Sequence, residues 1–308
     1  MTTAVPARTW AHRNLLDVEG MSRADIESVL ALAVEMREAR AARTHRSLLD
    51  AETVGLAFFE ASTRTRISFE LAAKALGATT VDLGVDRSSI GKGESLVDTL
   101  RTLERTGVTT VVLRHSASGA AHLAASATGL RIVNAGDGIH AHPTQALVDA
   151  LTLREAFGSL DGRLVVIVGD VAHSRVARSN IHVLQTLGAR VRVAGPASWV
   201  AGFDEWPGIE VAITLEGGLR DADAVMALRV QVERGAEVAS DHVVRWRLDD
   251  ERMALARPGA PILHPGPTNE GVELTADLAN GPRSLIGRQV ENGVPIRMAV
   301  LALVCGAA

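Results

Sequence analysis

The sequence predicts an α/β protein made of two parallel-sheet domains that face a central cleft. Short apolar runs alternate with longer segments of helical period, which is the rhythm of βαβ units. The rhythm pauses at 157–163 and restarts at 164–170, and 308 residues leave room for two domains of about 150 residues each. We therefore expect one domain over 1–150, with a C-terminal helix over 290–308 that packs back on it, and a second domain over 151–289.

In the first half, Ser22 and Asp25 predict a capped helix start, and apolar residues then recur at helical spacing. Apolar runs bounded by turn residues predict strands, whereas longer periodic segments that end at glycine, or begin at Pro143, predict helices. The expected strands are 54–59, 79–84, 109–114 and 131–136. The expected helices are 64–76, 95–106 and 143–157.

The second half repeats this pattern with a continuous apolar strand, a helix that ends at Gly188, and further strands. The last apolar segment predicts a buried terminal helix over 293–304. The expected strands are 164–170, 190–195, 222–229 and 261–266, and the expected helix after the first of them is 174–187.

Composition excludes several classes of protein. The net charge is −4, so no overall basic field would attract nucleic acid or an anionic membrane. Residues 1–15 lack the apolar stretch of a signal peptide, and 298–305 is far shorter than the roughly 20 residues that span a bilayer. Cys305 is the single cysteine, which is consistent with a reducing compartment. We expect a cytoplasmic protein without a nucleic-acid or membrane partner.

The sharpest local motif is Ser-Thr-Arg-Thr-Arg at 62–66, between a predicted strand and a predicted helix. The N–H groups and the dipole of a helix N-terminus favour an anion, and arginine fits a phosphate with two parallel hydrogen bonds. A P-loop fails because Asp86 and Gly93 occupy positions that require glycine and a hydroxyl. A dinucleotide fold fails because no glycine follows Gly169 until Gly188. The motif predicts a site for a small phosphate ester.

In the same order and spacing, the chain is similar to the aspartate/ornithine carbamoyltransferase family. The shared segments are STRTR with SFE, GKGESLVDTLRTL at 91–103, LRH at 113–115, NAGDG at 134–138, HPTQALVDALT at 142–152, GDVAHSRVARSN at 169–180, LRVQVER at 228–234 and HPGP at 264–267. The last two segments have the pattern of the aspartate enzymes rather than that of the ornithine enzymes. The resemblance therefore implies carbamoyl transfer from carbamoyl phosphate to the amino group of aspartate, in pyrimidine biosynthesis. Ornithine or another amino-acid acceptor is the alternative enzyme, and an inactive anion-binding homologue is the alternative class.

The resemblance also implies the role of each matching residue. Ser62, Thr63, Arg64 and Thr65 would bind the phosphate. Arg114 would bridge the phosphate and the carbamoyl oxygen, His142 would donate to that oxygen, and Gln145 would accept from the carbamoyl NH2. The aspartate ligands would be Lys92, Arg175, Arg229 and Gln231. Backbone carbonyls of Pro265, Gly266 and Pro267 would receive the carbamoyl NH2 and the attacking amine.

Lys92 lies in a glycine-flanked loop that, by resemblance, reaches the active site of a neighbouring subunit in a homotrimer, together with Ser88 or Ser89. Regulatory or dihydroorotase chains in a larger assembly are left open. No metal or organic cofactor is implied. Glu270 stands where the family commonly has arginine, which puts the nearby ion pairing in doubt.

Overall fold

The computed structural model describes residues 10–44, 47–83, 94–229, 245–269 and 271–308. The chain divides into two compact units, one formed by 1–147 with 292–308 and the other by 148–291. Each unit contains one sheet in which every strand pairing is parallel, which confirms the predicted fold class. That the two domains face a central cleft stays a prediction.

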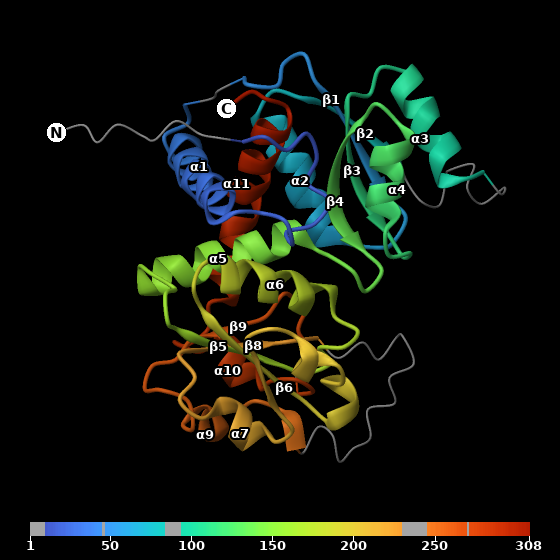
Figure 1. Cartoon of the computed structure of the whole chain (residues 1–308). Helices are drawn as coiled ribbons and strands as arrows, with labels where there is room; N and C mark the ends of the chain where they lie inside the picture. The colour runs from blue at the N-terminus through green and yellow to red at the C-terminus, as the bar shows by residue number, and fades with distance from the viewer. Residues whose placement is uncertain (1–9, 45–46, 84–93, 230–244, 270) are drawn as a thin grey trace. The chain divides into compact units, whose positions relative to one another are not determined.

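The first unit has the strand order β2-β1-β3-β4. Its strands are β1 (Thr53–Phe58), β2 (Thr79–Leu83), β3 (Thr110–His115) and β4 (Arg131–Asp137). Its helices are α1 (Arg23–Ala41), α2 (Thr63–Ala75), α3 (Leu96–Arg105) and α4 (Ala120–Ala127). The chain leaves this unit within α5 (Pro143–Phe157) and returns to it within α11 (Ile286–Val304). Figure 1 shows α3 and α4 on one face of this sheet and α1, α2 and α11 on the other.

The local sequence explains where these helices begin. Ser22 caps α1 in a full capping box with Asp25, as predicted, and Ser95 caps α3 by accepting from the Asp98 N–H. Leu100 of α3 and Ala121 of α4 pack with strand residues into one apolar cluster on their face of the sheet. Burial on both faces gives β1 and β3 their continuous apolar sequences.

The second unit has the strand order β7-β6-β5-β8-β9. Its strands are β5 (Leu164–Val168), β6 (Arg190–Ala194), β7 (Ile209–Ala212), β8 (Ala224–Ala227) and β9 (Ile262–Leu263). Its other elements are α6 (Arg175–Thr186), η3 (Ala197–Trp199), η4 (Phe203–Glu205), α7 (Leu215–Leu219), α9 (Asp250–Met253) and α10 (Ala276–Asn280). The last three helices contribute to one apolar cluster with β5 and β8.

Two details of the sequence interpretation were incomplete. The helix α4 and the strand β7 were not predicted, because an eight-residue alanine-rich segment and a half-exposed four-residue strand give weak periodicity. The terminal helix begins at Ile286 instead of near 290 or 293. The turns before 290 are helical as well, and they bury the side chain of Gln289, which donates to Asp149 at 2.7 Å.

Candidate functional site

The predicted phosphate motif and Arg114 follow neighbouring strands of the first unit. The chain leaves β1 towards β2 on one side, while β3 lies on the other side, so the strand order reverses between β1 and β3. Phe58 is in register with Arg114, and the Phe59 N–H donates to the Arg114 carbonyl at 2.8 Å. Ligands of open parallel sheets bind at such a reversal, beyond the carboxyl ends of the strands.

The N-terminus of α2 is suited to an anion. Ser62 is the N-cap residue, yet its side chain makes no capping hydrogen bond, and the first turn carries no acidic residue. In contrast, α1 and α3 each have a capping serine and an aspartate in the first turn. The positive end of the α2 dipole is therefore not balanced by a carboxylate of its own first turn, and a phosphate would balance it.

The other residues of the motif differ in burial. Thr65 is buried, whereas Thr63 and Arg64 are exposed at the start of the helix. Arg66, one residue further, is ion-paired with Asp82 of β2. Arg64 is therefore accessible to a ligand at the start of α2, and Arg66 contacts Asp82.

Arg114 is buried at the end of β3 and is held from two sides. Its Nη2 donates to Oε1 of Glu60 at 2.9 Å, and its Nη1 donates to the Ala135 carbonyl at 3.1 Å. Planar guanidinium groups that are fixed in this way lose little entropy when they bind a further anion. Glu60 was not identified from the sequence, although it lies only two residues before Ser62, the first residue of the motif.

His142 and Gln145 follow the next strand of the same sheet. β4 ends at Asp137, which is in register with His115 of β3. His142 is buried, and its carbonyl accepts the N–H groups of Gln145 and Ala146 at 3.1 and 3.3 Å, so the residue forms the entry to α5. His142 thus stands at the N-terminal end of α5, and the resemblance implies that it donates to the carbamoyl oxygen.

In the second unit the strand order reverses between β5 and β8, where Val168 is in register with Ala227. Arg175 is the first residue of α6, after β5, and is buried; Arg229 lies two residues after β8. Between them Gly169 has a φ of +128°, and a Cβ there would lie 3.1 Å from Cβ of Leu228. Glycine thus permits the close approach of the two strand ends from which both arginines emerge.

The turn after β9 is fixed by a buried pair. Nδ1 of His264 accepts the Gly266 N–H at 2.8 Å, and Nε2 lies 3.1 Å from Oε1 of Glu273. Since Nδ1 is an acceptor, the Nε2 hydrogen is the one that Glu273 receives. Glu273 also accepts the Asn269 N–H at 2.8 Å, so one carboxylate holds both ends of the turn that contains Pro265, Gly266 and Pro267. Glu273 was not singled out in the sequence.

Several predicted residues lie outside the described residues. These are Lys92, Gln231, Ser88, Ser89 and Glu270. Their proposed roles therefore stay predictions.

The two family models that match the chain cover nearly all of it. Residues 13–155 match the carbamoyl-P binding domain of aspartate/ornithine carbamoyltransferases, and residues 161–304 match the Asp/Orn binding domain. The chain belongs to the aspartate/ornithine carbamoyltransferase family.

Relatives within this family include two proteins of nearly the same length. The aspartate carbamoyltransferase catalytic subunit of Gluconacetobacter diazotrophicus is 51% identical over 296 residues, which are 94% of this chain and 92% of the relative. The catalytic subunit of Methylorubrum extorquens is 49% identical over 304 residues, which are 97% and 96% of the two chains.

Solved structures of the family share the fold. Aspartate transcarbamoylase from Trypanosoma cruzi, in complex with N-(phosphonacetyl)-L-aspartic acid, matches with a TM-score of 0.86 and 31% identity over 96% of this chain and 97% of that chain. Ornithine carbamoyltransferase from Pyrococcus furiosus matches with a TM-score of 0.85 and 27% identity over 96% and 97%. Because enzymes with either acceptor match equally well in fold, the fold alone does not distinguish aspartate from ornithine.

Proposed function

We propose that this protein is an enzyme that transfers the carbamoyl group of carbamoyl phosphate to the α-amino group of L-aspartate. The observation that carries the proposal is the register of Phe58 with Arg114, because it places the uncompensated start of α2 and a fixed arginine at one sheet edge. The choice of aspartate is supported by the names of relatives about half identical to the chain. The products are N-carbamoyl-L-aspartate and phosphate, a step of pyrimidine biosynthesis.

The first unit would bind carbamoyl phosphate through the residues of the sequence prediction. Backbone N–H groups of α2, with Ser62, Thr63, Arg64 and Thr65, would hold the phosphate. Charge-assisted hydrogen bonds are worth about 1.5–3 kcal/mol each, so a few of them suffice for a small ester. Arg114 would span the phosphate and the carbamoyl oxygen.

The second unit would bind aspartate. Arg175 would pair with the α-carboxylate, and Arg229 and Gln231 would pair with the side-chain carboxylate. Two arginines after adjacent strands suit a dicarboxylic amino acid, whereas ornithine would need an acidic group near its side-chain amine. Lys92 would complete this set from a neighbouring subunit.

The chemistry requires positioning more than acid–base groups. The uncharged amine attacks the carbamoyl carbon, a tetrahedral oxyanion forms, and the C–O bond to phosphate breaks as the leaving phosphate accepts the amine proton. Thr65, Arg114 and His142 would donate to the oxyanion, and donors of this kind are typically worth about 2.7–4 kcal/mol. Gln145 and the carbonyls of 265–267 would orient the two nitrogen atoms.

The acceptor is tested by measuring phosphate release with aspartate and with ornithine. Turnover with aspartate and none with ornithine is expected, and the reverse result would reject the proposal. Release with neither amino acid, from a protein that still binds carbamoyl phosphate, would favour the inactive homologue.

The phosphate site is tested by Arg64→Ala, with Arg66→Ala as a matched control on the same helix. Arg64→Ala should lower kcat/KM for carbamoyl phosphate by about 10²-fold or more, by analogy with other lost transition-state donors. Arg66→Ala should change it little, because that guanidinium is paired with Asp82. Near-normal kinetics of Arg64→Ala would contradict the assignment.

We also propose that the enzyme is a cytoplasmic homotrimer with shared active sites. No helix among the described residues is long and apolar enough to cross a membrane. Mixing inactive Lys92→Ala and Arg64→Ala subunits should restore part of the activity, because some sites would then contain neither substitution. A mixture that regains no activity would argue against shared sites.

A further inference from the structure

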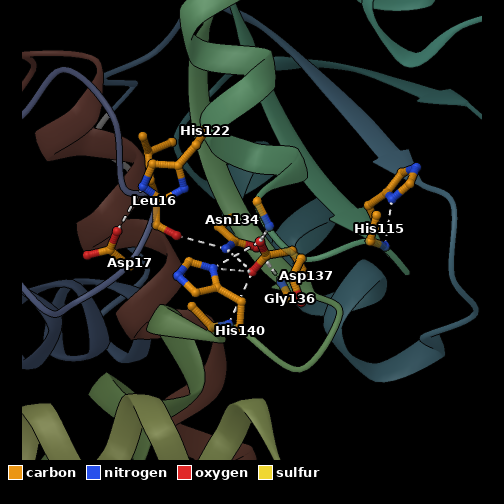
Figure 2. A network of polar contacts seen from close by, with 12 residues as sticks. Leu16, Asp17, His115, His122, Asn134, Gly136, Asp137 and His140 are labelled. Atoms are coloured by element: carbon orange, nitrogen blue, oxygen red, sulfur yellow. Dashed lines mark hydrogen bonds and ion pairs between the residues drawn. The ribbon is translucent and has the colours of Figure 1, made fainter.

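A buried carboxylate that has no role in the proposed reaction lies at the end of β4. Asp137 is 1% exposed. Its Oδ2 accepts the Gly119 N–H at 2.7 Å, and its Oδ1 accepts the Ala141 N–H at 3.1 Å. Oδ1 also accepts the Asn134 side chain at 2.8 Å, and Figure 2 shows these two side chains side by side. A carboxylate so far from water is tolerated only with such donors, so the fold is built around this group.

These bonds connect segments that are distant in the sequence. Gly119 caps the start of α4, and the Asn134 side chain also donates to the Leu16 carbonyl at 2.7 Å. The Asn134 Oδ1 accepts the Gly136 N–H at 2.8 Å, which fixes the end of β4 itself. Hydrogen bonds therefore link Asp137, directly or through Asn134, to the start of α4 and to the segment before α1.

The segment 137–141 closes on the same residue. The Asp137 N–H donates to the Ala141 carbonyl at 3.1 Å, while the Ala141 N–H donates to the Asp137 side chain. Gly138 donates to the His115 carbonyl at 3.0 Å, and a Cβ on Gly138 would lie 2.5 Å from the Ser118 backbone nitrogen. The turn is thus packed tightly against the end of β3, and the residue that follows it is His142.

His140 covers the open side of the carboxylate. Its Nδ1 lies 3.1 and 3.0 Å from the two Asp137 oxygens. Its ring meets the ring of His122 edge to face with 5.5 Å between centroids, and His122 Nε2 lies 3.0 Å from the Asp17 side chain. Figure 2 shows this chain of contacts from Asp17 to Asp137.

We propose that Asp137 is a positioning residue that sets the place of His142 during carbamoyl transfer. The inference rests on the proposed function of His142 as a donor to the carbamoyl oxygen. Because the Asp137 side chain accepts the Ala141 N–H, its loss would remove one of the two hydrogen bonds by which residue 137 holds the backbone directly before His142, and would leave only the bond from the Asp137 N–H to the Ala141 carbonyl. A displacement of about 1 Å at a reacting group can lower the rate about 10²-fold, even when the substrate still binds.

The test is a double-mutant cycle of Asp137→Asn and His142→Ala. Asparagine keeps the size of the side chain but replaces one acceptor oxygen with a donor, so at least one of the backbone bonds is lost. Alone, Asp137→Asn should lower kcat by about 10²-fold with a much smaller change in KM for carbamoyl phosphate. In the His142→Ala background the same substitution should change kcat by less than about twofold, because residues that act through one another are not additive. Equal effects in the two backgrounds would overturn the proposal.

A second readout does not depend on turnover. Amide hydrogen exchange of 138–146 should become faster in Asp137→Asn, while the amides of α2 keep their wild-type rates. Exchange at 138–146 that equals the wild-type rate would overturn the proposal even if activity falls. If the wild-type enzyme forms no carbamoyl-aspartate from carbamoyl phosphate and aspartate, the proposed function is rejected instead.

Asp223→Asn is the matched control for a buried carboxylate. Asp223 is also buried, accepts the Leu164 N–H at 2.8 Å and contacts two arginines in the second unit. This substitution should lower Tm without the loss of kcat seen for Asp137→Asn. If Asp223→Asn and Asp137→Asn lower Tm equally and also lower kcat equally, the effect of Asp137→Asn is due to lost stability, and the positioning role is overturned.

Discussion

The carboxylate of Glu60 holds the guanidinium of Arg114, with Nη2 2.9 Å from Oε1 and both side chains less than one-fifth exposed. The pair joins the segment after β1 to the end of β3. It therefore orients the arginine that is proposed to span both parts of carbamoyl phosphate.

The first prediction concerns this pair. Glu60→Ala should lower kcat/KM for carbamoyl phosphate by about 10²-fold, because Arg114 loses the carboxylate that holds its Nη2 and reorients. Glu60→Gln should retain more activity, since its amide oxygen can still accept the Nη2 hydrogen. Steady-state kinetics of the two variants check this, and wild-type values for the alanine variant would show that Glu60 does not position Arg114.

The second prediction concerns the turn after β9. Glu273→Ala would remove the acceptor of the buried His264 Nε2 hydrogen, which costs about 1–3 kcal/mol, and the acceptor of the half-buried Asn269 N–H, which costs less. The free energy of unfolding should fall accordingly, and KM for aspartate should rise because the carbonyls of 265–267 shift. Glu210→Ala is the control in the same unit, since Glu210 is 39% exposed and its pairs with Arg190 and Arg192 should contribute about 1 kcal/mol or less. Equal destabilisation by both substitutions would contradict the role of the buried turn.

The third prediction concerns pH. Burial lowers the pKa of His115, against the opposing effect of Asp137 and Glu60, and its Nδ1 accepts the Ala117 N–H at 2.9 Å. At a pH between the lowered pKa of the folded protein and the ordinary value of about 6.5, the His115 side chain is more often protonated in the unfolded chain than in the folded one. The free energy contributed by neutral His115 should therefore be complete above this pH range and decrease as the pH falls through it.

His115→Asn isolates this contribution, because the asparagine oxygen can accept the Ala117 N–H but does not titrate in this range. The unfolding free energies of wild type and variant are measured with urea from about pH 5 to 7.5. As the pH falls, the wild type should lose more stability than the variant. A difference that is independent of pH would contradict the lowered pKa.

The fourth prediction concerns the capping box of α1. Burial would raise the pKa of Asp25, but hydrogen bonds from Ser22 and the contact with His12 outweigh it and lower the pKa. Ser22→Ala should cost about 1 kcal/mol at neutral pH, because the Asp25 N–H and carboxylate both lose a partner. Below the lowered pKa of Asp25, the difference between wild type and variant should shrink as the carboxylate becomes protonated.

Ser28→Ala provides the control within the same helix. The Ser28 hydroxyl only donates to the Ala24 carbonyl of the preceding turn, and alanine is the better helix former. Stability should stay constant or rise by a few tenths of a kcal/mol. Urea unfolding of both variants decides the matter, and an equal loss in both would show that capping is not the cause.

Local pattern was sufficient for most of the fold. The capping residues Ser22 and Ser95, the proline that begins α5 and the apolar strands 53–58 and 110–115 act within a few residues, so their positions follow from periodicity and end signals. The helix α4 and the early turns of α11 were missed because their sequences show no clear alternation of apolar and polar residues at helical spacing, so the periodicity did not mark them.

The candidate site divides in the same way. The sequence by itself determined the phosphate motif at the start of α2, the family resemblance and the arginines after the strands, because these depend on residue type and order. Only the tertiary structure decided that Glu60 orients Arg114, that Glu273 ties the turn after β9 and that Asp137 holds the segment before His142. These partners lie 54, 4 and 4 residues apart in the chain. Even residues that are four apart form these hydrogen bonds only in the folded protein, where the carboxylates are buried beside the donors. The reason is that a buried charge requires hydrogen-bond partners nearby in space, whatever their distance in the sequence.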